Sequence, residues 1–399
     1  MKKSKIVLGL LVLSCLLSSL LAGCSKPPAE TKVTEAEVSE SAQATETKAI
    51  EAEAQPADGM RTILDGDGQE VEIPNEVKTC VVVGIYPLPA AIANYLGSGE
   101  KIIGMDAFAK AAAEHGLLGK LYPEILKAKT DFMDGEELNI ESLLALKPDV
   151  VFHSAENDKV REMLKNAGIP AIGVHARKHE YNCIETYNDW FELLHRVFPG
   201  EGPDSSEVTA YSQKVYDQIQ DRIKDIPEDE RVRALSIFRY ADDKLLVSGK
   251  SFFGNWWITS TGGINVASDV EANGPQPVNM EQVLSWNPEV IFITNFSGAM
   301  PEDLYSNAIG GDDWSTISAV QNQRVYKMPL ASYRTFTPGV DTPVTMLWTA
   351  KQLYPEQFSD VDIAQEFKNY YKEMFNVELS DEDVAAILNP PREAAGKHK

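Results

Sequence analysis

The sequence LNIESLLALKPDVVFHS at residues 138–154 has a near copy 140 positions later, VNMEQVLSWNPEVIFIT at residues 278–294. Six of the seventeen paired positions are identical. In each copy an asparagine, Asn139 or Asn279, can cap a short helix, and a glutamate follows where the helix dipole favours negative charge. A proline then ends the helix, and a β-branched and aromatic run typical of a buried parallel strand follows. The repeat predicts the same helix–strand unit in each of two α/β lobes.

The N-terminus predicts an export signal. Three lysines precede an apolar run that is too short to cross a bilayer as a helix. The run closes on Leu-Ala-Gly-Cys at residues 21–24, which resembles the lipobox of bacterial lipoproteins, in which the cysteine is acylated. An ordinary signal peptide followed by a chance cysteine is the alternative. We therefore expect residues 1–23 to be a signal peptide and the protein to be extracytoplasmic, anchored to the bacterial cell membrane by lipid on Cys24.

Residues 24–59 predict a disordered acidic tether. From residue 25 onward this stretch has no aromatic residue and carries eight acidic residues against three lysines, so it cannot bury enough apolar surface to fold alone. The whole chain has a formal net charge of −23 at pH 7. Such a surface repels phosphate backbones, so we expect no nucleic-acid partner. A free anion would need a local cluster of arginines to overcome the same field.

The remaining residues predict a two-lobed α/β protein. Strand-like runs alternate with helix-like runs, which indicates mostly parallel, Rossmann-like sheets. The strand-like runs lie at residues 80–83, 101–104, 150–153, 171–174, 234–238, 290–294 and 325–328. An alternating segment at residues 62–74 predicts a hairpin, and apolar residues at helical spacing from Val208 to Ile223 predict one long helix. We assign residues 60–203 to the N-terminal lobe, 204–228 to the linking helix, and 229–399 to the C-terminal lobe with its closing helices.

Two cysteines remain in the folded part, Cys80 and Cys183. They either pair in an oxidising compartment or remain buried thiols that act as small apolar side chains. The sequence leaves both alternatives open.

Together the lipobox, the acidic tether, the two lobes, the linking helix and the paired units resemble the solute-binding lipoproteins of ABC importers. The branch is class III of the periplasmic binding proteins, which serves ferric siderophores, haem and corrinoids, and the resemblance covers roughly residues 60–390. It implies a monomeric binding protein, not an enzyme, that captures a small-molecule metal chelate in a cleft between the lobes. The chelate is then delivered to the permease, the transmembrane subunits of the importer. In that family the glutamates that open the paired helices, here Glu141 and Glu281, meet arginines on the permease.

Ligand-binding candidates lie in loops that follow strands, because open α/β sheets bind ligands at the carboxyl ends of their strands. The candidates are Tyr86, Phe108, His153 and His175 in the N-terminal lobe and Arg239, Tyr240, Trp256, Trp257, Tyr333 and Arg334 in the C-terminal lobe. Aromatic faces suit flat ligands, and arginines bind carboxylate or catecholate oxygens. Packing in turns or in the core is the alternative for the tyrosines, the histidines and one of the two adjacent tryptophans.

Two other functions compete with chelate binding. The first is binding of a bare or small-ligand-bound transition metal such as nickel, and a bare metal would need three or four His, Asp or Glu ligands in a tight shell. The histidines of the folded part are spread without a His-x-His pattern, so no metal site is predicted. A surface-anchored metal-chelate enzyme would need a catalytic motif, but the sequence has no GxSxG, HExxH or phosphate-binding glycine loop. We therefore predict no catalytic residue and no cofactor.

Overall fold

The computed structural model describes residues 59–135, 137–241, 244–271 and 273–396. These residues belong to a single compact unit that spans residues 54–399. The predicted signal peptide, Cys24 and nearly all of the predicted tether lie outside the described residues. Within the described ranges no helix combines the length and the apolar character needed to cross a membrane.

The N-terminal lobe contains a four-stranded parallel sheet in the order β4-β3-β7-β8. Its strands are β3 (Cys80–Val83), β4 (Ile102–Gly104), β7 (Val150–Ser154) and β8 (Ala171–Val174). The β-branched and aromatic side chains of β3 and β7 are buried because both faces of the sheet are covered. The helices of this lobe are α1 (Leu88–Leu96), α2 (Ala107–His115), α3 (Leu117–Leu121), α4 (Ile140–Leu146), α5 (Asp158–Asn166) and α6 (Cys183–Val197), with the 3-10 turn η1 (Pro123–Lys127).

Two hairpins accompany this sheet. The first, β1 (Met60–Leu64) with β2 (Glu70–Pro74), is antiparallel and confirms the predicted hairpin. Buried Asp65 holds its turn: one carboxylate oxygen accepts from two amides of the turn, at 2.9 Å each, and the other accepts from Gly173 N of β8 at 3.0 Å. The second hairpin is short and consists of β5 (Met133–Asp134) and β6 (Glu137–Leu138).

The C-terminal lobe contains a mixed sheet in the order β12-β10-β9-β13-β14, with β11 also paired to β9. Its strands are β9 (Arg233–Ala241), β10 (Lys244–Ser248), β11 (Ile264–Asn265), β12 (Pro275–Val278), β13 (Val290–Ile293) and β14 (Val325–Lys327). The pairs among β11, β9, β13 and β14 are parallel, whereas β10 and β12 are antiparallel additions. The helices of this lobe are α8 (Phe253–Ser260), α9 (Met280–Trp286), α10 (Pro301–Tyr305) and α11 (Ser318–Gln321).

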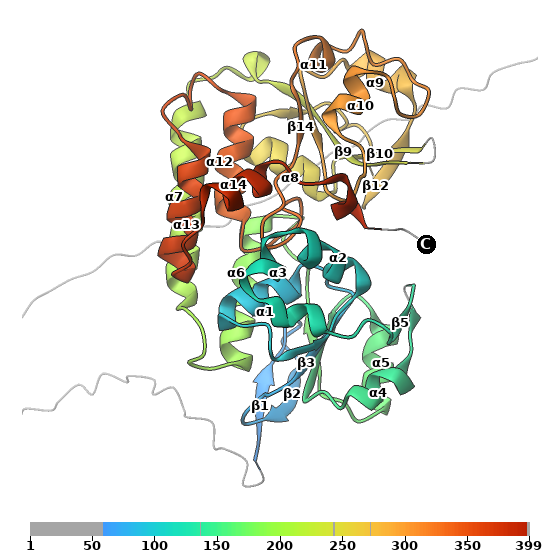
Figure 1. Ribbon diagram of the computed structural model, residues 1–399, viewed down its shortest axis with the longest axis vertical. Coiled ribbons are helices and arrows are strands. Elements are labelled where there is room, and N and C mark those ends of the chain that lie inside the picture. Colours follow the sequence, from blue (N-terminus) through green and yellow to red (C-terminus); the bar gives the residue numbers. More distant parts are fainter. Residues whose placement is uncertain (1–58, 136, 242–243, 272, 397–399) are drawn as a thin grey trace, which may run out of the picture. The chain divides into compact units, whose positions relative to one another are not determined.

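A helical layer lies beside both sheets, at the left of Figure 1. Its members are α7 (Ser205–Ile223), α12 (Thr342–Leu353), α13 (Ile363–Phe375) and α14 (Asp381–Leu388), with the 3-10 turns η2 (Glu228–Glu230) and η3 (Arg392–Ala395) elsewhere in the second half of the chain. Helix α7 buries Val208, Val215, Ile219 and Ile223 along one face, as the apolar spacing predicts. It packs against α6 and α12, which come from opposite halves of the chain.

The two repeated units lie in different sheets. Asn139 caps α4 by accepting from Ser142 N at 3.0 Å, and Asn279 caps α9 by accepting from Gln282 N at 2.9 Å. Both helices end on a left-handed residue, and each is followed by an interior strand: β7 lies between β3 and β8, and β13 lies between β9 and β14. The predicted duplication and the α/β fold class are confirmed.

Cys80 and Cys183 are both free and fully buried. Burial raises the pKa of Cys80 to about 12 and that of Cys183 well above its ordinary value. Of the two alternatives left open by the sequence, the structure shows the second, a pair of unlinked thiols that pack as small apolar side chains.

Candidate functional site

A cavity of about 290 Å³ opens at the carboxyl ends of the strands of the N-terminal sheet. It is lined by Val83, Gly84, Tyr86, Asp106, Met133, Ser154, Glu156, Asn157, Val160 and Arg177. Apart from Met133 of β5, these residues come from the ends of β3, β4, β7 and β8 or from the segments that follow, and parallel strands bring those ends to one edge of the sheet. This edge is where open α/β sheets bind their ligands.

Asp106 supplies a buried carboxyl group to this cavity. It lies just after β4 and is 4% exposed, and its Oδ2 accepts a hydrogen bond from Gly84 N at 2.9 Å. Gly84 has φ 75°, a left-handed conformation that glycine adopts without strain, so its amide can turn toward the carboxylate. Burial disfavours the charged form and raises the pKa of Asp106 to about 6, although the hydrogen bond from Gly84 opposes that shift.

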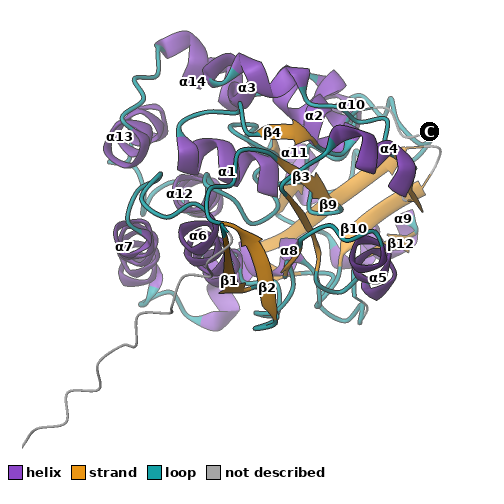
Figure 2. Ribbon diagram, turned by 90° about the horizontal axis from the view of Figure 1, so that it is seen from below, coloured by secondary structure: helices purple, strands orange, loops and turns teal. Residues whose placement is uncertain are grey.

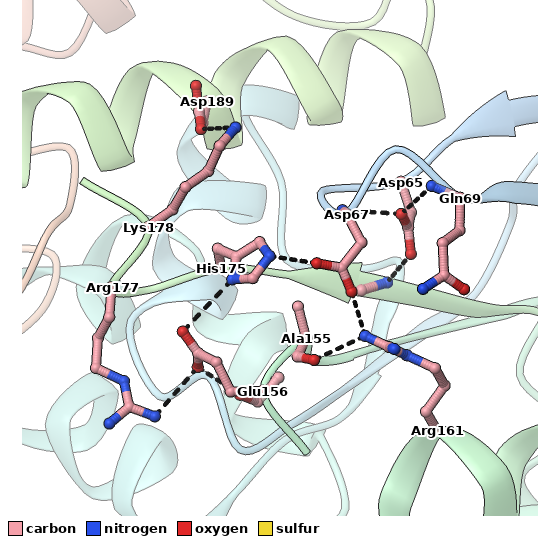
Figure 3. A network of polar contacts seen from close by, with 12 residues as sticks. Asp65, Asp67, Gln69, Ala155, Glu156, Arg161, His175, Arg177, Lys178 and Asp189 are labelled. Atoms are coloured by element: carbon pink, nitrogen blue, oxygen red, sulfur yellow. Dashed lines mark hydrogen bonds and ion pairs between the residues drawn. The ribbon is translucent and has the colours of Figure 1, made fainter. Parts of the chain in front are cut away.

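A chain of ion pairs leads from the first hairpin to the cavity (Figure 3). Asp67, in the hairpin turn, contacts both Arg161 of α5 and Nε2 of His175. The other ring nitrogen of His175 lies 3.5 Å from Glu156, and Glu156 in turn lies 3.4 Å from Arg177. Basic and acidic side chains thus alternate along the chain and fix Glu156 and Arg177 at the cavity wall.

Arg177 is the cation of the cavity, and half of its side chain is exposed. Burial alone would lower its pKa, but attraction to Glu156 and hydrogen bonds to Tyr181 and Glu156 raise it overall, so it remains charged. The ring of Tyr181 packs edge-on against Phe253, with centroids 4.9 Å apart, and lies 5.8 Å from Phe252. Tyr181 therefore connects the polar wall of the cavity to the C-terminal lobe.

The corresponding edge of the C-terminal sheet is aromatic. Phe238 lies on β9, Phe296 follows β13, and Phe336 follows β14. Phe238 stacks on Phe296 with centroids 5.0 Å apart, and it also contacts Phe252 at 5.4 Å and Phe336 at 5.7 Å. Phe238 and Phe252 are only partly buried. The two lobes thus present different chemistry at equivalent edges, polar in the first and aromatic in the second.

Arg334 joins the lobes, and its predicted role as a ligand-binding guanidinium stays a prediction. It is fully buried and donates to Asn295 O at 3.0 Å in its own lobe, to Phe108 O at 3.0 Å in the N-terminal lobe, and to Ala394 O at 2.8 Å in η3. It also donates to the hydroxyl of buried Tyr333 at 3.0 Å, and it lies over that ring. Tyr333 is therefore also placed by packing.

The structure places the N-terminal candidates differently. Tyr86 lines the cavity, and the ring of Phe108 packs against it with centroids 5.7 Å apart. His175 belongs to the ion-pair chain behind the cavity. His153 is 1% exposed and faces the interior, where burial lowers its pKa and its Nδ1 lies 2.9 Å from Ser154 O. Its ligand contact stays a prediction.

The remaining C-terminal candidates do not meet at one place. Tyr240 is buried in a core cluster beside Trp314, and Trp257 is buried and donates to Phe336 O at 2.6 Å. Their ligand roles stay predictions. Trp256 lines a separate cavity of about 400 Å³ beside α6 and α7. Arg239 is partly exposed on β9, where it lies opposite Leu246 of β10.

Asp106, Glu156 and Arg177 are the charged cavity residues that sequence reasoning missed. The rule that selected Tyr86, a position just after a strand, also applies to all three. The four candidates of the N-terminal lobe are aromatic residues and histidines, so a selection by those side-chain types does not find the charged residues beside them. Among the described residues, no three His, Cys, Asp or Glu side chains form a group that could hold a metal ion.

The family model described as "Periplasmic binding protein" matches residues 82–331. The chain belongs to this family. It is 28% identical over 349 residues to the molybdate-binding protein MolA of Haemophilus influenzae, a match that covers 82% of this chain and 93% of that protein. It is 25% identical to the uncharacterized ABC transporter substrate-binding lipoprotein YvrC of Bacillus subtilis, over 75% of this chain and 87% of that protein.

Solved structures agree with this assignment. A periplasmic solute-binding protein from Veillonella parvula superposes with a TM-score of 0.73 at 28% identity, covering 83% of this chain and 97% of the other. Further relatives are named as vitamin B12-binding proteins and as an Fe(3+)-citrate-binding protein, so the ligand varies within the family. The chain is therefore an extracytoplasmic substrate-binding protein of an ABC importer that binds a small ligand and is not an enzyme.

Proposed function

We propose that this substrate-binding protein captures a compact metal chelate of low net charge at the cavity of the N-terminal lobe. The chelate is delivered to the permease of an ABC importer, and lipid on Cys24 keeps the protein at the membrane. The cavity's mixture of charges carries the proposal. Arg177 and the hydroxyl of Tyr86 suit the carboxylate, hydroxamate or catecholate oxygens of a chelator, whereas the Asp106 and Glu156 carboxylates lie close to the positive centre of a metal complex.

The same charges disfavour a free oxyanion. Among the described residues that line the cavity, one is an arginine and two carry carboxyl groups. Because the chain as a whole carries a net charge of −23, no surplus of positive charge compensates for them. A chelate can present both signs, because its oxygens surround a cation.

The volume supports a small member of the chelate class. Ligand cavities in proteins span about 300 to 1,000 Å³, and this one, at about 290 Å³, lies at the lower end. A citrate or hydroxamate complex fits that size better than haem or a corrinoid does. The partly exposed Phe238 and Phe252 supply an apolar surface for the side of the ligand that leaves the N-terminal lobe.

We assign docking to the two repeated units. Glu141 and Glu281 are both exposed, in the first turns of α4 and α9, and each lies in a different lobe. Exposed ion pairs contribute only about 0.2–1 kcal/mol each, so two of them orient a complex more than they hold it.

A ligand panel tests the proposed function. The purified protein is mixed with ferric citrate, a ferric hydroxamate, cyanocobalamin, haemin, molybdate or nickel chloride, and its thermal unfolding and calorimetric binding are measured. We expect a ferric chelate to stabilise the fold by about 2.7 kcal/mol at 100 times its dissociation constant. Arg177→Ala should remove most of this stabilisation, whereas Lys224→Ala, which removes an exposed cation after α7, should not. Stabilisation by molybdate or nickel alone would contradict the ligand class.

A further inference from the structure

Four large hydrophobic side chains are exposed among the described residues: Leu64, Leu144, Leu284 and Tyr305. Leu144 and Leu284 occupy the same position in the two repeated units, and their exposed fractions are almost equal, 44% and 43%. Two exposed leucines that recur at one position of a duplicated unit call for an explanation that covers both lobes.

Folding of the repeated helices does not require these leucines. The residues just before them, Leu143 and Val283, are fully buried and anchor α4 and α9 to their sheets. Leu144 instead follows Glu141 by three positions, as Leu284 follows Glu281, and residues three apart share one face of a helix. Each unit therefore presents an acidic and an apolar side chain side by side on its exposed face.

Both units lie on the same side of the folded part, away from α7 (Figures 1 and 2). Identical asparagine caps and left-handed helix ends give α4 and α9 the same local geometry. A single partner can therefore contact both faces at once, one in each lobe.

We propose that Leu144 and Leu284, together with Glu141 and Glu281, form a two-point docking surface for the permease. This inference rests on the docking role of the glutamates in the proposed function, and it adds the two leucines as apolar contacts of the same surface. The surface requires a partner with two equivalent binding sites, each an apolar depression beside a basic residue. The glutamates orient the complex, and burial of the leucines contributes most of its strength, because burying an apolar side chain stabilises more than an exposed ion pair does.

A second copy of this chain does not fit the docking surface. Any pairing of α4 or α9 with its counterpart in another copy places glutamate against glutamate, in a molecule that already has a net charge of −23. A basic and apolar partner removes that repulsion.

The first test is photo-crosslinking of the full-length lipoprotein in cells that carry its importer. A benzophenone amino acid replaces Leu144, Leu284 or, as the matched control, Leu64, which is 51% exposed and lies at the end of β1. We expect adducts with the transmembrane subunits from the first two positions and none from the third. Adducts with a second copy of the chain would overturn the proposal.

The second test measures binding of the purified full-length protein to its importer in lipid nanodiscs. We expect Leu144→Ser and Leu284→Ser each to weaken binding about tenfold and together about a hundredfold, because distant sites add. Leu64→Ser should change nothing, and no variant should alter unfolding temperature. Unchanged binding in the double leucine variant, with loss in Glu141→Lys/Glu281→Lys, would refute the leucines but keep the docking role. Unchanged binding in both double variants would refute the docking role itself.

Discussion

Asp106 and Arg177 show how the fold sets the chemistry of single residues at the cavity. The first is a carboxyl group whose pKa burial raises, and the second is a cation held in place by Glu156 and Tyr181. The sequence locates such residues, because they follow strands, but it does not reveal their burial. Arg334 makes the same point in reverse: its position after β14 predicts ligand contact, whereas the packing of η3 and α2 encloses it completely.

The raised pKa of Asp106 predicts a pH dependence of stability. Its pKa is about 6 in the folded protein against about 3.9 in an unfolded chain, so folding favours the protonated form. The resulting stability is fully present below about pH 4 and is lost as the pH rises through about 6. Asp106→Asn should reduce that decline by roughly 3 kcal/mol. Urea unfolding of both proteins at pH 4 and pH 7 measures the difference, and parallel pH profiles would contradict the prediction.

At the level of the element, local sequence signals were sufficient to predict the repeated helix–strand units. They were insufficient to predict β12, the edge strand of the C-terminal sheet. Asparagine, glutamate, proline and a β-branched run together specify α4 with β7 and α9 with β13. Strand β12 contains Pro275 and Pro277, which remove ladder donors and hide a strand from sequence reasoning. It is tolerated because it lies at the edge of its sheet, where one side needs no partner.

The asparagine caps should contribute equally to the two lobes. Asn139→Ala and Asn279→Ala each leave an amide of the first helical turn without its acceptor, so each should lower the free energy of unfolding by about 1 kcal/mol. Chemical denaturation measures both, with Gln213→Ala on the exposed face of α7 as a control of no more than about 0.5 kcal/mol. A loss of stability in only one of the two asparagine variants would show that the N-termini of α4 and α9 are not equivalent.

The C-terminal turn η3 should stabilise the contact between lobes. Removing residues 390–399 takes Ala394 O from buried Arg334 and should cost about 2–3 kcal/mol, because a charged group loses an acceptor. Arg392→Ala removes the partly exposed pair with Asp303 and one exposed hydrogen bond to Gly298 O, and it should cost less than about 1 kcal/mol. Thermal unfolding compares the two variants, and a truncated chain as stable as the full one would exclude this role for η3.

On the scale of the whole molecule, the sequence predicted two lobes with a repeated helix–strand unit in each, but not the contrast between a polar and an aromatic edge. That contrast depends on which side chains of β9, β13 and β14 meet in space. Phe238, Phe296 and Phe336 are spread over about a hundred residues of sequence. No local pattern brings them together.

Reversing both docking charges tests the molecule as a carrier. Glu141→Lys/Glu281→Lys should abolish ligand uptake by cells while leaving the ligand affinity of the purified protein unchanged, because both residues are exposed and neither lines the cavity. Radiolabelled uptake and calorimetry measure the two quantities. Uptake at the normal rate would remove the docking assignment, and a matched loss of affinity would move the glutamates to the ligand site.

The buried guanidinium of Arg334 has a consequence for ligand release. Separation of the two lobes would leave this buried positive charge without acceptors from both lobes and from the C-terminal turn. Spontaneous opening therefore has a high free-energy cost. We expect the protein to retain its ligand until the importer, driven by ATP, supplies the energy to break these hydrogen bonds.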